Sequence, residues 1–113
     1  MRNQLLCFFL LLAAPAQAQG QRIPAVGECF DVRGKVYLSS NSGVVFDTDT
    51  QRYFLAGRDD CFPATVKNPM TNDFRAVVAG AYRICREPDD YNQFGVMHIV
   101  CIKTASGLSV SRY

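Results

Sequence analysis

The segment that most constrains the fold is the last third of the chain, residues 76–104. Two apolar runs rich in Val, Ile and Tyr flank a stretch of turn-forming residues, and each run contains one cysteine, Cys85 or Cys101. Such runs, with Gly, Pro, Asp and Asn between them, are typical of a long β-hairpin. The sequence therefore predicts two paired strands here, with a turn centred near Asn92 and Gln93.

Three further strands are expected upstream of the hairpin. Apolar and polar side chains alternate over residues 28–38, as in a half-buried strand, and Gly34 interrupts the apolar face where a bulge or bend is expected. Residues 43–47 and 52–56 predict two more strands, each preceded by a polar turn. The connector that follows contains two prolines, so it is expected to be irregular or to hold only a short helical turn.

The N-terminus has the pattern of a Sec-type signal peptide. Arg2 precedes an unbroken apolar run over residues 5–14, and Ala16 and Ala18 form an A-x-A cleavage site. The apolar run is shorter than the roughly 20 residues that a helix needs to span a bilayer. Cys7 lies inside this run rather than after small residues at its end, which argues against a lipoprotein.

We therefore expect residues 1–18 to be removed, residues 19–27 to form a flexible lead-in and residues 28–113 to form a single domain. The predicted location is the periplasm or the extracellular space, without membrane insertion after cleavage. The 113 residues less these 18 leave 95, enough for one small domain. Without Arg2 the chain has 11 basic and 10 acidic residues, so there is no basic excess and no nucleic-acid partner is expected.

Four cysteines remain after cleavage: Cys29, Cys61, Cys85 and Cys101. An even number in a small exported domain predicts two disulfides. Their wide spacing lacks the close C-x₂-C pairs of a zinc site. Of the three pairings, we expect Cys29–Cys61 together with Cys85–Cys101, because the predicted hairpin brings the last two into cross-strand register.

The expected order is strand–turn–strand–turn–strand, then a connector and a long hairpin, which is the order of the OB-fold barrel. The patterns CFDVRGKV near the start and VAGAYRIC and MHIVCIK near the end resemble small exported bacterial OB-type domains. The resemblance implies an all-β fold: a small, antiparallel, five-stranded OB-like barrel that is stapled by disulfides. It also implies a binding surface over strands two and three, flanked by the first and last hairpin loops.

Aromatic and basic side chains at predicted outward positions form the candidate ligand-binding surface. Aromatic rings stack on sugars or bases, and guanidinium groups donate hydrogen bonds to hydroxyl or carboxylate groups. The candidate residues are Arg33, Tyr37, Arg52, Tyr53, Arg83, Tyr91 and Phe94. Because a strand alternates faces, the residues expected to point into the core are Phe30, Val32, Val36, Tyr82 and Ile84. The alternative is that the aromatic and basic residues are ordinary surface positions of a small sheet.

The sequence lacks a pattern typical of catalysis or metal binding. His98 is the only histidine and lies in a predicted strand, where a structural role is expected because no nucleophile and orienting acid accompany it. The segment Asp47-Thr48-Asp49 lacks the glycine and distal glutamate of a calcium loop, so it predicts a hairpin turn. We therefore expect no enzymatic activity, no metal site and no cofactor.

The predicted function is that of an exported, non-catalytic binding module that recognises a protein or a glycan. One alternative is a structural or accessory protein of the cell envelope without a discrete ligand. Two more specific forms of such a binding module are an inhibitor of a secreted hydrolase and a glycan-binding subunit of the toxin type. The toxin-type version predicts a homo-oligomeric ring, which light scattering would detect.

Overall fold

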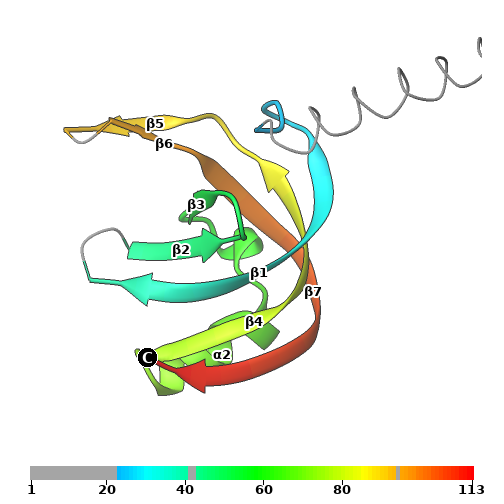
Figure 1. Ribbon diagram of the computed structural model, residues 1–113, viewed down its shortest axis with the longest axis vertical. Coiled ribbons are helices and arrows are strands. Elements are labelled where there is room, and N and C mark those ends of the chain that lie inside the picture. The colour runs from blue at the N-terminus through cyan, green and yellow to red at the C-terminus, as the bar shows by residue number, and fades with distance from the viewer. Residues whose placement is uncertain (1–22, 41–42, 94) are drawn as a thin grey trace, which may run out of the picture.

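The computed structural model describes residues 23–40, 43–93 and 95–113 (Figure 1). The predicted signal peptide and residues 19–22 of the lead-in lie outside the described residues. The described chain is mostly β-structure with one α-helix, which confirms the expected β-rich fold. The connector was expected to be irregular or to hold only a short helical turn, but it contains a helix of nine residues that includes Pro69. The described part contains no helix that is long and apolar enough to cross a membrane.

Five strands form one sheet that closes into a ring, in the order β1-β2-β3-β7-β4 with β4 pairing back to β1. The pairs are antiparallel except for the parallel pair of β3 and β7, which corrects the expectation of a purely antiparallel sheet. The strands of the ring are β1 (Cys29–Ser39), β2 (Gly43–Asp47), β3 (Arg52–Leu55), β4 (Ala76–Arg86) and β7 (Ile99–Arg112). The bounds of the first four agree closely with the sequence prediction, because each strand carries its own alternation of apolar and polar residues, whereas β7 runs on to Arg112, past the expected end of the hairpin at residue 104.

Two further elements lie outside the ring. Between β4 and β7, β5 (Asp90–Asn92) and β6 (Gly95–Met97) form a separate two-stranded hairpin that projects from the ring (Figure 1). Between β3 and β4, a short 3₁₀ helix, η1 (Asp59–Cys61), precedes α2 (Ala64–Asn72). The helix places the fully buried Val66 in the core of the ring, so the connector also closes part of the hydrophobic interior.

The core is built from the inward faces of all five ring strands. Val36, Tyr82 and Ile84 are buried as predicted, and Phe30 and Val32 are half-buried and pack against the same cluster. The hydroxyl of Tyr82 donates a 2.6 Å hydrogen bond to the carbonyl oxygen of Val78, which satisfies this polar group inside the core. Burial raises the pKa of Tyr82 to about 12, so the phenol is neutral over the physiological pH range.

Gly34 lies where the β1 backbone closely approaches its neighbours, whereas the bulge or bend expected there is not seen in the regular pairing of β1 with β4. It lies opposite Gly80 of β4. A Cβ atom on Gly34 would lie 2.6 Å from the carbonyl oxygen of Asp47 and 2.8 Å from the ring of Phe46. Both distances are shorter than van der Waals contact, so this position in β1 accepts only glycine without a shift of the backbone or the core.

We therefore expect Gly34→Ala to lower the free energy of unfolding by about 1–3 kcal/mol, the range for overpacking a filled core. Urea unfolding would measure it. The matched control is Gly57→Ala, because no heavy atom lies within 4 Å of a Cβ built on Gly57. Equal stability of the two variants would contradict the close packing at Gly34.

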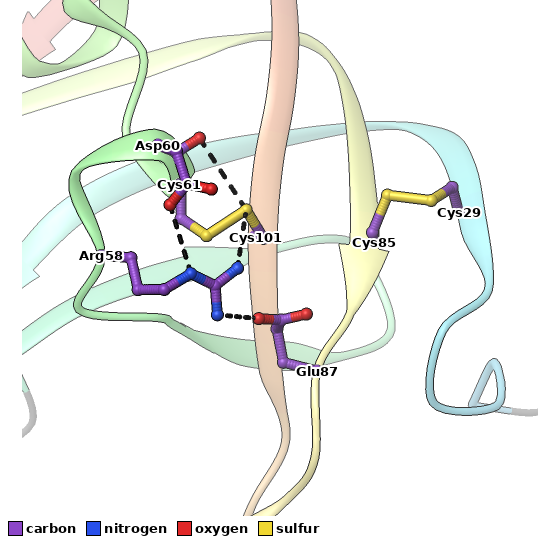
Figure 2. The surroundings of a disulfide bond; sticks show 7 residues. All are labelled: Cys29, Arg58, Asp60, Cys61, Cys85, Glu87 and Cys101. Carbon is purple, nitrogen blue, oxygen red and sulfur yellow. Dashed lines mark hydrogen bonds and ion pairs between the residues drawn. A yellow bond between two sulfur atoms is a disulfide. The ribbon is translucent and has the colours of Figure 1, made fainter.

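The structure contains two disulfides, but their pairing differs from the predicted one (Figure 2). The observed bonds are Cys29–Cys85, between β1 and β4, and Cys61–Cys101, between η1 and β7. The predicted register of Cys85 opposite Cys101 is correct, yet Cys85 also lies opposite Cys29 in the neighbouring strand. The prediction missed that β1 lies beside β4 and that η1 brings Cys61 to Cys101. The two disulfides indicate an oxidising compartment.

Candidate functional site

The seven predicted binding residues do not form one surface. Tyr53 is only 3% exposed and packs in the core against Phe46 and Phe30, which corrects its assignment to the outer surface. The physical reason is strand alternation: Arg52 and Tyr53 are neighbours in β3, so only one of them can face outward. Phe94 lies outside the described residues.

Tyr37 and Arg52 are brought together on the outer surface, where the carboxylate of Asp47 joins them. The Tyr37 hydroxyl donates to Asp47 Oδ2 at 2.6 Å, and Arg52 Nε donates to Asp47 Oδ1 at 2.9 Å. Arg52 Nη2 also donates to the Tyr37 hydroxyl at 2.8 Å. Asp47 was not among the predicted site residues. These three side chains satisfy one another, so the cluster ties β1, β2 and β3 together rather than presenting free groups to a ligand.

The electrostatics of this cluster follow from its hydrogen bonds. Desolvation acts to raise the pKa of Asp47, but the hydrogen bonds from Arg52 and Tyr37 outweigh it and hold this pKa below its ordinary value. Desolvation and the neighbouring Asp47 carboxylate raise the pKa of Tyr37. At neutral pH the cluster therefore consists of a carboxylate, a guanidinium and a neutral phenol.

A cleft of about 510 Å³ lies between the ends of β2 and β3 and the base of the β5–β6 hairpin. Apolar side chains from three separate segments line it: Val44, Phe54, Leu55, Met97 and Ile99. This volume is within the range of about 300–1,000 Å³ found for small ligand sites. The cleft combines apolar and charged lining.

The charged lining of the cleft is mainly acidic. Glu87, Asp89 and Asp90 line it together with a single base, Arg58. Arg58 forms an ion pair with Glu87 and lies 3.9 Å from the sulfur of Cys101, so the guanidinium sits beside the disulfide that anchors η1 (Figure 2). Among the described residues, the exposed side chain of Asp90 accepts a hydrogen bond only from the backbone N–H of Tyr91.

Asp89 is held in place by a buried cation. Arg86 Nη2 donates to Asp89 Oδ1 at 2.7 Å, and the same oxygen lies 3.2 Å from His98 Nδ1. The hydrogen bond from Arg86 lowers the pKa of Asp89, with a smaller contribution from His98. The acid therefore keeps its charge at neutral pH, and Arg86 fixes the base of the hairpin relative to the ring.

None of the predicted residues in the described chain lines this cleft. Tyr91 is 72% exposed and pairs with Val96 on the β5–β6 hairpin, whereas the cleft is lined by the adjacent pair, Asp90 and Met97. Because faces alternate along a strand, Tyr91 lies on the opposite face of the hairpin. The available sequence signal was the cluster of three acids over residues 87–90, which lies between the two apolar runs of the predicted hairpin.

Arg33 and Arg83 meet elsewhere, on the outer surface of β1 and β4. Together with Asp31, Ala81, Thr104 and Ser106 they line a hollow of about 370 Å³. Arg83 forms a 3.2 Å ion pair with Asp31, whose side chain is 79% exposed. Two of the predicted arginines therefore share a concave surface here.

No family model, curated protein or solved structure matches this chain. Within residues 23–40, 43–93 and 95–113, no group of three or more His, Cys, Asp or Glu side chains is arranged to hold a metal ion. The functional argument therefore rests on the geometry and charge of the cleft and the hollow.

Proposed function

We propose that this protein is an exported, non-catalytic binding module with an OB-like fold, and that it binds an extended segment of a partner protein in the cleft beside the β5–β6 hairpin. Three features support the OB-like assignment: the ring order β1-β2-β3-β7-β4, the parallel pair of β3 and β7, and a helix between β3 and β4.

The observation that carries the proposal is the position of the cleft. It lies where β2 begins and β3 ends, next to the connection between β4 and β7. The OB-type resemblance places ligands on strands two and three, between the first and last hairpin loops. The cleft lies at the end of that surface, and Asp90 and Met97 of the β5–β6 hairpin line one side of it.

The chemistry of the lining favours a protein segment with apolar and basic side chains. The apolar floor, which includes Val44 and Leu55, suits the side chain of a Leu, Ile or Val residue, and the acidic rim suits a neighbouring Lys or Arg. A neutral sugar without charged groups binds mainly by stacking on an exposed aromatic face, and the only aromatic ring of the described lining, Phe54, is half-buried in β3. A neutral glycan in this cleft is therefore the less favoured occupant.

The test uses the chain from Gln19 and short synthetic peptides in which Lys flanks Leu and Val, compared with Glu-flanked peptides of the same apolar sequence. We expect the Lys peptides to bind and to shift the backbone NMR signals of Val44, Leu55 and Met97. Asp90→Asn should weaken binding several-fold, because one unpaired rim charge is lost. Gly57→Leu, which places a side chain at the cleft where a Cβ meets no atom within 4 Å, should abolish it.

The matched control is Asp49→Asn, which removes an exposed acid in the β2–β3 turn away from the cleft. Equal weakening by Asp49→Asn and Asp90→Asn would contradict the proposal, because it would indicate attraction to the net charge alone. Equal binding of the Glu-flanked peptides would also contradict it. Binding of neutral oligosaccharides at the same residues would instead assign the cleft to a glycan.

A further inference from the structure

The hollow around Ala81 has a geometry set by strand register. Two rows of side chains cross β1, β4 and β7: Arg33, Ala81 and Ser106 form one row, and Asp31, Arg83 and Thr104 form the next. The centre of the first row is a methyl group, so a depression of about 370 Å³ opens between the longer side chains around it. Val32 and Tyr82 pack into the core and contribute backbone to the floor.

The pairing of β4 with β7 is irregular on both sides of this hollow. The register between β4 and β7 shifts between Ala79 and Ala81 and again between Arg83 and Ile84. Such bulges bend a strand and change the direction of side chains on its outer face. Here they lie on both sides of the β7 segment that supplies Thr104 and Ser106, so the hydroxyl groups border a curved surface rather than a flat sheet.

The hollow is rich in unused hydrogen-bond donors. Among the described residues, Arg33 has no hydrogen bond or ion pair, and Arg83 uses one nitrogen for Asp31. A guanidinium has five N–H donors, so most of those on these two side chains have no protein acceptor. Asp31 is the single acid in the lining, so the local charge of the hollow is positive.

We propose that this hollow binds one acidic saccharide unit, with its carboxylate or sulfate group between Arg33 and Arg83. Guanidinium groups recognise planar or tetrahedral oxyanions through paired N–H donors. The hydroxyls of Thr104 and Ser106 donate to and accept from sugar hydroxyls, and the methyl group of Ala81 contacts the apolar face of the ring. The hollow is much larger than a single oxyanion needs, since one water occupies about 30 Å³, and its size suits a sugar.

The experiment titrates the chain from Gln19 with galacturonate, oligogalacturonate, galactose and sodium sulfate, followed by NMR at constant ionic strength. We expect both uronates to shift the backbone signals of Arg33, Ala81 and Ser106, and galactose to bind at least tenfold more weakly. If the oligomer binds more tightly than the monomer, the source is a glycan chain, whereas equal affinities indicate a free acidic sugar. Sulfate that binds as tightly as galacturonate would overturn the proposal, because it would show a site for simple anions.

Three variants distinguish specific binding in the hollow from general attraction of an anion to basic surface residues. Arg33→Gln should weaken galacturonate binding about tenfold or more, since a charge-assisted hydrogen bond is lost. Ala81→Leu, which fills the hollow but keeps every charge, should abolish binding. The control Arg75→Gln removes an exposed base outside the hollow and should leave the affinity unchanged. Unchanged affinity in Ala81→Leu, or equal loss in Arg75→Gln, would overturn the proposal. Peptide binding in the cleft is measured in a separate titration. The result for sugar binding in the hollow therefore does not depend on the proposed function.

Discussion

Replacement of Arg86 by Met should lower the free energy of unfolding by about 3–5 kcal/mol, the range for breaking a buried ion pair from one side. Arg86 is 3% exposed and donates to the carbonyl oxygens of Pro24 and Ile99, at 3.1 and 2.7 Å, besides its ion pair with Asp89. Methionine fills a similar volume but satisfies none of these acceptors. Chemical denaturation of the disulfide-bonded protein would measure the loss.

The same substitution should also loosen the β5–β6 hairpin and the described part of the lead-in, because Arg86 joins both to the ring. Hydrogen exchange of the backbone N–H groups from 90 to 97 would report this loosening. The matched control is Arg83→Met, which removes an exposed ion pair with Asp31 and should cost less than about 1 kcal/mol. Equal costs for the two arginines would show that Arg86 does not organise this end of the fold.

Removal of the Cys61–Cys101 disulfide by a double substitution to Ala should lower the free energy of unfolding by about 4 kcal/mol, from chain entropy for the 40-residue separation. This is a large share of the stability of a small domain, which is typically about 5–15 kcal/mol. Both cysteines are fully buried, and the bond fixes η1 and Arg58 against β7. We therefore expect the variant also to lose the shape of the cleft, observed as NMR shifts at Arg58 and Glu87.

The pairing itself is open to a direct check. Non-reducing peptide mapping should yield peptides that link Cys29 to Cys85 and Cys61 to Cys101. Mild reduction should open Cys29–Cys85 first, because Cys29 is exposed whereas Cys61 and Cys101 are buried. A peptide that links Cys85 to Cys101 in the mature protein would contradict the structure.

The elements that sequence reasoning located correctly are those with a local signal. The alternation in β1 predicted its buried face, including Val36. Gly34 was correctly singled out as a special position, although its role is a close contact with Asp47 and Phe46 and the pairing of β1 with β4 is regular there. The register of Cys85 opposite Cys101 followed from the centre of the hairpin. Each of these depends on residues that are near one another in the chain.

The features that sequence reasoning missed depend on contacts between distant segments. The parallel pairing of β3 with β7 and the partner of each cysteine are set by how the ring closes, and no local pattern contains that information. The cleft collects residues from near 44, from 54–58 and from 87–99, so it becomes visible only after folding. Tyr53 was assigned outward because its aromatic ring suggested a ligand, although the outward Arg52 beside it implied the opposite face.

The row of three cysteines across β1, β4 and β7 has a consequence for maturation. Cys85 and Cys101 are 16 residues apart and meet as soon as the local hairpin forms, whereas the native partners are separated by 56 and 40 residues. Closing the shorter loop is favoured over the 56-residue loop by about 1 kcal/mol of chain entropy. We therefore expect the non-native bond to form first during oxidation and to be exchanged when β1 docks beside β4 and η1 reaches β7. Oxidation without a catalyst of disulfide exchange should therefore leave a mispaired fraction, which non-reducing peptide mapping of the refolded protein would detect.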